Sequence, residues 1–87
     1  MNSNKQINTN VYDDQLLNKM IVGIGKNIRE ERLKRDLSYR DLSKLTNVDS
    51  SQIYKIEIGA AKVGVLTLVK VMIALEIPAN ILIPINL

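Results

Sequence analysis

Residues 38–59 of the chain, SYRDLSKLTNVDSSQIYKIEIG, predict two short helices joined by a tight turn. Ser38 stands at an N-cap position, where its hydroxyl can accept a hydrogen bond from a free backbone N–H at the start of a helix. Asp41 lies three residues later and complements the dipole of that helix. The first helix is expected to run from Tyr39 to about Leu45, because poor helix formers follow and Asn47 tolerates a left-handed backbone.

The second helix of this stretch is expected from Ser50 to Ile58. Asp49 is placed to cap it with Gln52 reaching back to the cap, and Gly59 is placed to end it. The apolar residues are spaced so that each helix can bury one side in a common core, and they are Leu42, Leu45, Val48, Ile53 and Ile56. The other side of the second helix carries hydrogen-bonding groups with no evident place in a core. Two such helices have the layout of a DNA-reading helix-turn-helix.

Length and composition restrict the classes of protein that the chain can belong to. Its 87 residues make one domain, small enough that a second subunit would help to stabilise it. It contains no cysteine and no histidine, so neither a disulfide framework nor a zinc site is expected, and the cysteine usage suits a reducing cytoplasm. No paired carboxylates or phosphate-binding glycine loop are evident, so no catalytic residue, metal, cofactor or small-molecule ligand is expected.

No targeting or membrane segment is predicted. The first fifteen residues are polar and rich in asparagine, unlike a signal peptide. The longest apolar run, residues 71–87, is interrupted by Glu76 and by two prolines, so it is not a membrane-spanning helix. A soluble, cytoplasmic protein is expected.

The positive charge is concentrated in the middle of the chain. The formal net charge is +3, and residues 21–62 carry nine lysines and arginines against six acids, which gives the whole +3. The remaining residues are neutral overall. This distribution favours a polyanionic partner next to the helix-turn-helix.

The sequence divides into a flexible arm, residues 1–12, and a helical domain, residues 13–87. The domain begins with a helix that starts between Asp13 and Ile21, and a glycine pair (Gly23 and Gly25) allows a break in it. Its apolar face is expected to comprise Leu16, Leu17, Met20, Ile21, Ile24, Ile28 and Leu33. A further helix is expected from Val65 to Leu75, and a last short one from Ala79, stopped by Pro84. The prediction is an all-α fold of five helices.

These features resemble the Cro and phage-repressor type of helix-turn-helix regulator, the XRE family, from Ile21 to about Ile83. The matching residues are Ile24-Gly25-Lys26-Asn27-Ile28-Arg29, Leu37-Ser38, Leu42-Ser43, Ile53, Ile56-Glu57, Gly59, Leu68, Leu75 and Leu82. The resemblance implies a compact λ-repressor-like domain that binds double-stranded DNA. The loop Lys62-Val63-Gly64-Val65 also resembles the controllers of restriction–modification genes, which tend to have valine where others have proline.

The resemblance also implies roles for single residues. Base edges in the major groove would be contacted by Ser50, Ser51 and Lys55, with Gln52 beside them. By hydrogen-bonding chemistry, Gln52 suits adenine and Lys55 suits guanine. Phosphates would be contacted by Tyr39, Arg40, Tyr54 and Lys62. Tyr39 replaces a glutamine usual in the family, while Tyr54 also suits a thymine-methyl contact or simple packing. The alternative for this polar face is an ordinary solvated helix surface.

Two further expectations concern structure. Arg32 and Glu57 match a buried ion pair that ties the first helix to the third in related folds. The end of the chain carries more apolar residues than a small core can enclose, and a homodimer interface is expected at Leu66, Ile73, Ile81, Ile83, Ile85 and Leu87. The alternative is burial of this surplus against the first helix through Leu16, Leu17 and Met20.

The sequence therefore predicts a dimeric, sequence-specific transcriptional regulator, a repressor or autoregulator, that binds a palindromic operator. A two-fold dimer would place its recognition helices about 34 Å apart, one turn of DNA. The competing hypothesis is a protein-interaction module, such as an antitoxin or an anti-repressor partner, that uses the same apolar surface.

Overall fold

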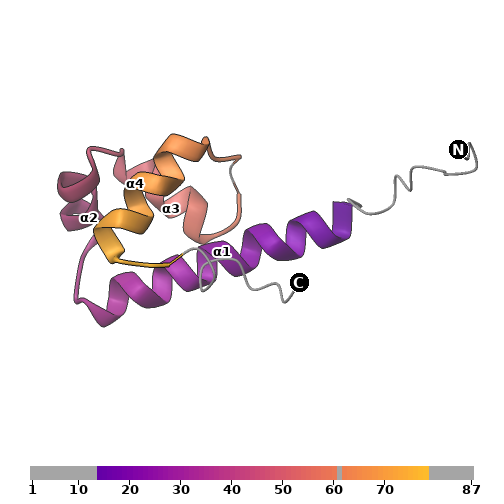
Figure 1. The fold of residues 1–87 in the computed structure, drawn as a ribbon, viewed down its shortest axis with the longest axis horizontal. Coiled ribbons are helices and arrows are strands. Elements are labelled where there is room, and N and C mark those ends of the chain that lie inside the picture. Colours follow the sequence, from indigo (N-terminus) through magenta and orange to yellow (C-terminus); the bar gives the residue numbers. More distant parts are fainter. Residues whose placement is uncertain (1–13, 61, 79–87) are drawn as a thin grey trace, which may run out of the picture.

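The computed structural model describes residues 14–60 and 62–78, and these form four helices and no strand (Figure 1). The helices are α1 (Asp14–Lys34), α2 (Tyr39–Thr46), α3 (Ser50–Glu57) and α4 (Val65–Leu75). The all-α fold is confirmed, and the predicted bounds of α4 are those observed. The expected arm at residues 1–12 and the expected fifth helix from Ala79 lie outside the described residues.

The core lies between the four helices, where α3 and α4 pack against both the C-terminal half of α1 and helix α2. It is formed by Ile28, Leu42, Val48, Ile53, Ile56, Val71, Leu75 and Ile77. The N-terminal half of α1 projects beyond the other three helices (Figure 1). All three buried residues of α1, namely Gly25, Ile28 and Arg32, belong to its last ten residues. The N-terminal half of the helix is therefore only partly covered by its own domain.

The glycines of α1 do not break the helix, which is continuous over 21 residues. Gly25 is buried against the end of α3, and a Cβ atom there would overlap the carbonyl oxygens of Ile56 and Glu57. The absent side chain lets the two helices approach until backbone meets backbone. The break that the glycine pair allowed is absent, because Gly25 permits close packing of α1 and α3 and does not change the direction of the helix.

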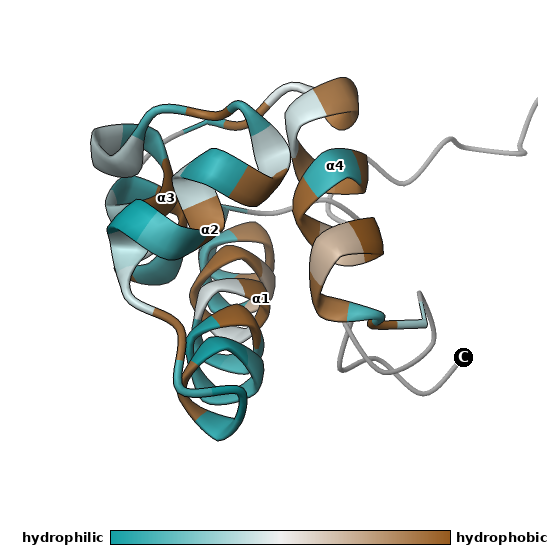
Figure 2. Cartoon of the chain, turned by 90° about the vertical axis from the view of Figure 1, so that its left-hand side faces the viewer, coloured by the Kyte–Doolittle hydropathy of each residue, from teal (hydrophilic) through white to brown (hydrophobic). Residues whose placement is uncertain are grey.

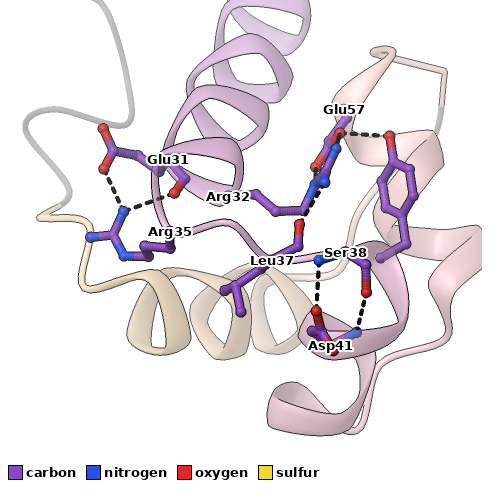
Figure 3. Close-up of polar contacts among 8 residues, drawn as sticks. Glu31, Arg32, Arg35, Leu37, Ser38, Asp41 and Glu57 are labelled. Carbon is purple, nitrogen blue, oxygen red and sulfur yellow. Dashed lines mark hydrogen bonds and ion pairs between the residues drawn. The ribbon is translucent and has the colours of Figure 1, made fainter.

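The cap of α2 is the predicted capping box. The Ser38 hydroxyl accepts from the Asp41 N–H at 3.0 Å, and the Asp41 carboxylate accepts from the Ser38 N–H at 2.9 Å (Figure 3). Asn47 ends the helix in the left-handed conformation, with φ of 59°. The predicted left-handed Gly59 after α3 is also present, with φ of 70°.

The start of α3 differs from the prediction. Asp49 occupies the N-cap position, but its side chain makes no capping hydrogen bond. The backbone holds the turn instead, since the Asp49 carbonyl accepts from the N–H groups of Gln52 and Ile53. The buried Thr46 hydroxyl also connects α2 to this turn, because it donates to the Leu42 carbonyl and accepts from the Val48 N–H.

Several leucines expected in the core are exposed. Leu45 is 62% exposed, because α2 buries the Leu42 and Thr46 side of the helix and Leu45 points away from it. Leu33 is 52% exposed near the end of α1. Leu16 and Leu17 are exposed on the projecting half of that helix, so the described residues do not show the surplus apolar surface buried there.

The capping box predicts a pH dependence of stability. The hydrogen bond from the Ser38 N–H holds the pKa of Asp41 below its ordinary value, so the folded state favours the carboxylate. A depressed folded-state pKa contributes stability that is present at neutral pH and lost as the pH falls through it. Asp41→Asn should therefore be less stable than wild type near neutral pH, and the difference in urea midpoint should disappear in acid. A difference independent of pH would contradict this role of the charge.

Candidate nucleic-acid interface

Helix α3 separates its side chains into a buried side and an exposed side. Ile53, Ile56 and Glu57 are buried, whereas Ser51, Gln52 and Lys55 are exposed and Ser50 is half-buried. In Figure 2 the outer surfaces of α2 and α3 are mainly hydrophilic, in contrast with the apolar α4. The four side chains expected to contact bases thus share one short helix and are accessible to a large partner. A duplex is the kind of partner whose groove admits such a helix.

The position of α3 is fixed by the expected ion pair with α1 (Figure 3). Arg32 Nε donates to Glu57 Oε2 at 2.7 Å, and Arg32 Nη2 donates to Glu57 Oε1 at 3.1 Å. Arg32 Nη1 donates to the carbonyl of Leu37, the residue that leads into the helix-turn-helix. Both side chains are buried, with 7% and 1% of their surface exposed. The hydrogen bond to Glu57 raises the pKa of Arg32, so the guanidinium keeps its positive charge.

Tyr39 joins this pair. Its hydroxyl donates to Glu57 Oε1 at 2.8 Å, and its ring lies beneath the Arg32 guanidinium, 4.1 Å from Cζ to the ring centre. Burial raises the pKa of Tyr39, which keeps the donated proton on the oxygen. In the free protein the one hydroxyl hydrogen is thus donated to Glu57, and the phosphate contact of Tyr39 stays a prediction. Tyr39 lies where it can hold α3 in place.

Tyr54, also expected on a phosphate, packs by its edge against Tyr39. Their ring centres are 5.9 Å apart and the planes make an angle of 82°. Tyr54 is still 49% exposed. Tyr54 therefore packs against a neighbouring ring, as one of the three alternatives expected, and about half of its surface is still accessible to a partner.

A polar hollow of about 380 Å³ lies beside the start of α3. It is lined by Asn47, Val48, Asp49, Gln52, Lys62, Val63, Gly64, Thr67 and Lys70. Lys62, expected near the phosphates, borders this hollow together with Gln52, and Arg40 is exposed on α2. Lys70 also lines this hollow, and no role was predicted for it from the sequence. Its place could have been inferred, because Thr67 and Lys70 are three residues apart in an otherwise apolar helix and must share one face.

The residues expected at a dimer interface are exposed wherever they are described. Leu66 is 69% exposed and Ile73 is 71% exposed, both on α4. Ile81, Ile83, Ile85 and Leu87 lie outside the described residues. Helix α4 thus presents large aliphatic side chains to solvent on the side away from the core.

Neither a membrane-spanning helix nor a metal site is present in the described part of the chain. No helix among residues 14–60 and 62–78 combines the length and the apolar character needed to cross a membrane. Within the same residues, no three potential metal ligands of the aspartate, glutamate, histidine or cysteine types lie close enough together to hold an ion.

Comparison with known proteins gives a family and a relative of known structure. The helix-turn-helix family model matches residues 28–82. The crystal structure of the restriction-modification controller protein C.AhdI from Aeromonas hydrophila is similar, with 31% sequence identity and a TM-score of 0.66. The match covers 71% of this chain and 94% of the controller protein. No curated protein sequence matches the chain.

Proposed function

Because this chain belongs to the XRE-type helix-turn-helix family of DNA-binding transcription regulators, we propose that it binds a palindromic operator as a homodimer and acts as a repressor or autoregulator. The observation that carries the proposal is the exposed polar side of α3. The buried Arg32–Glu57 ion pair fixes α3 in place, and the polar hollow, which Lys62 and Lys70 line, lies beside the start of this helix. The experiment that tests it is binding to duplex DNA of defined sequence.

The proposed contacts fall into two groups. Ser50, Ser51, Gln52 and Lys55 contact base edges, with Gln52 suited to adenine and Lys55 to guanine. Arg40, Lys62 and Lys70 neutralise phosphates on either side of the groove and set the register, with Tyr54 at the edge of the same surface. The two serines discriminate little between bases, so part of the sequence preference comes from DNA shape.

Lys55→Ala is expected to weaken operator binding by about 1–3 kcal/mol and to relax the sequence preference at one operator position. The loss should be largest on the preferred base, because the alanine variant no longer distinguishes it. The measurement is titration of the operator and of its single-base variants. Lys19→Ala, an equal change of charge on the projecting half of α1, should leave both quantities unchanged. Equal weakening of every sequence by Lys55→Ala would make Lys55 a phosphate contact.

The homodimer is proposed to form through Leu66 and Ile73 of α4 together with Ile81, Ile83, Ile85 and Leu87. The support is the exposure of the first two residues and the apolar character of the last four. Exposed aliphatic groups that adjoin one another on a small domain mark protein interfaces more often than open surface. A two-fold axis through this region gives two α3 helices and two matching half-sites.

Ile73→Glu is expected to convert the dimer to a monomer, because it places a charge in a dehydrated apolar interface. The association should weaken by about 2 kcal/mol or more, as for a residue at the centre of an interface. Sedimentation equilibrium measures the change, and Ile81→Glu and Ile83→Glu carry the same expectation. Leu33→Glu, at an exposed leucine on α1, should remain dimeric. If all three interface variants kept the mass of the dimer, this surface would be removed from the proposal and the homodimer would have to form through another one.

A further inference from the structure

One flank of α3 is contacted by an aromatic side chain from the start of α2. Tyr39, the first residue of α2, packs edge-on against Tyr54 of α3, with ring centres 5.9 Å apart. Its hydroxyl donates to Glu57, three residues further along α3. Residues three apart on a helix share one face, so Tyr39 contacts neighbouring turns of α3 on a single flank. Because α3 has only eight residues, these two contacts span its C-terminal half.

Tyr54 stands at the border between the buried and the exposed side of α3. At about 100° per residue, it lies about 60° from the buried Glu57 in one direction and about 60° from the exposed Ser51 in the other. Gln52 lies on the opposite flank, beside the polar hollow. A rotation of α3 about its own axis would drive Tyr54 into the Tyr39 ring or draw it away. The aromatic contact therefore opposes this rotation.

Tyr39 is itself held at its backbone, its face and its hydroxyl. The capping box of α2 directly precedes and fixes its backbone. The Arg32 guanidinium lies over the face of the ring, 4.1 Å from its centre, and Glu57 accepts from the hydroxyl at 2.8 Å. A ring held in this way has little freedom to turn. It gives the half-exposed Tyr54 a fixed surface to pack against.

The rotation of α3 matters for the contacts proposed with bases. A constellation of interacting groups works only when it is held within about 0.5 Å and 10–20° of its productive geometry. Ser51 and Lys55 lie on the exposed side of α3, next to Tyr54, and would move with the helix. Phosphate contacts by lysine are more tolerant, because a point charge on a flexible stem can follow its partner. Freedom of α3 to rotate would thus reduce sequence preference more than general affinity for DNA.

We propose that Tyr39 is a positioning residue for DNA recognition, whose ring holds Tyr54 and so fixes the rotation of α3 in the groove. The inference rests on the operator binding proposed above. The ring of Tyr39 is the part that positions α3, and the hydroxyl serves by fixing the ring on Glu57. This role differs from the predicted phosphate contact, for which the hydroxyl and not the ring would be needed.

The test compares the affinity for the selected operator with the affinity for its single-base variants. The ratio of the two dissociation constants is measured on one preparation, because any loss of folded protein cancels from it. Tyr39→Ala should lower this ratio by about 2- to 10-fold, the contribution of one aromatic pair. Tyr39→Leu carries the same expectation and is used if the alanine variant does not fold. Tyr39→Phe keeps the ring and should retain the ratio of the wild type.

A double-mutant cycle tests whether the effect passes through Tyr54. In protein that already carries Tyr54→Ala, the further change Tyr39→Ala should alter the ratio by less than about 2-fold, because the ring contact is already lost. Leu45→Ala is the matched control on α2. It removes an exposed aliphatic side chain beside α4 and should leave the ratio unchanged.

The remaining outcomes overturn the inference in different ways. If Tyr39→Phe and Tyr39→Ala weaken the binding of every sequence equally, the hydroxyl is a phosphate contact, and operator binding stands. A lower melting temperature with an unchanged ratio would make Tyr39 a residue of the fold alone. A ratio that falls equally with and without Tyr54 would exclude the route through that ring. If the wild-type protein prefers no sequence, the proposed function fails and the inference fails with it.

Discussion

Glu57→Ala should be severely destabilised, by about 3–5 kcal/mol, because it leaves the buried Arg32 charge without a partner. Three donors lose their acceptor at once, namely Arg32 Nε, Arg32 Nη2 and the Tyr39 hydroxyl. For a domain of this size the melting temperature should fall by about 12 °C or more. Thermal unfolding followed by circular dichroism measures the change.

A matched control lies on α1, the helix that carries Arg32. Glu31 pairs with Arg35 at 2.7 Å, as short as the Arg32–Glu57 contact, but on the surface of α1 (Figure 3). Glu31→Ala should have a much smaller effect, because water can solvate the groups that it leaves behind. Equal effects of Glu57→Ala and Glu31→Ala would show that burial of the Arg32–Glu57 pair does not determine the stability of the fold.

Gly25→Ala is the second substitution with a large expected effect, despite adding a single methyl group. In a free helix the change would stabilise by about 1 kcal/mol. Here the new Cβ would overlap the carbonyl oxygen of Ile56 and lie 2.7 Å from that of Glu57, so α1 and α3 would have to separate. Backbone atoms cannot rotate aside as a side chain can, and a net loss of about 2–3 kcal/mol is expected from urea unfolding.

Gly64→Ala provides the comparison, since no atom lies within 4 Å of a Cβ placed there. The backbone of Gly64, with φ of −68°, also suits an ordinary residue. Gly64 is the N-cap residue of α4, where alanine is less favourable than glycine, so its substitution should cost no more than about 1 kcal/mol. If Gly25→Ala behaved like Gly64→Ala, the close approach of α1 and α3 would be refuted.

Local chemistry explains what could be predicted from the sequence. The cap of α2, its left-handed end at Asn47, the glycine after α3 and the bounds of α4 each depend on a few neighbouring residues, and all were predicted. The Arg32–Glu57 pair was expected from the resemblance to a family and not from spacing, because 25 residues separate its members.

The errors arose where distant parts of the chain meet. Whether Gly25 kinks a helix or admits a neighbour depends on the carbonyl groups at the end of α3, which no pattern near residue 25 reveals. The hydrogen bond from Tyr39 to Glu57, 18 residues away, was likewise not predicted, while the phosphate contact of Tyr39 stays a prediction. Leu45 has helical spacing suited to a core, but α2 buries the side that carries Leu42 and Thr46 instead.

The candidate interface, like the fold, could be predicted only where it depends on neighbouring residues. The accessible polar side of α3 follows from the alternation of its buried and exposed residues. Lys70 was not predicted because it lies in an otherwise apolar helix, about 20 residues after the start of α3, beside which it lines the polar hollow. Its contribution to binding is expected to be electrostatic and independent of sequence, so it sets affinity more than preference.

The most direct test of the proposed function is selection of binding sites from a random duplex pool with the purified protein, at about 50 and 200 mM salt, between which phosphate-dominated binding falls steeply. The expected result is an enriched inverted repeat whose half-site centres are separated by about one turn of DNA. The repeat should be lost when the pool is selected with Lys55→Ala combined with Gln52→Ala. No enrichment even at the lower salt concentration would contradict the proposal and favour a protein-interaction module built on the same fold.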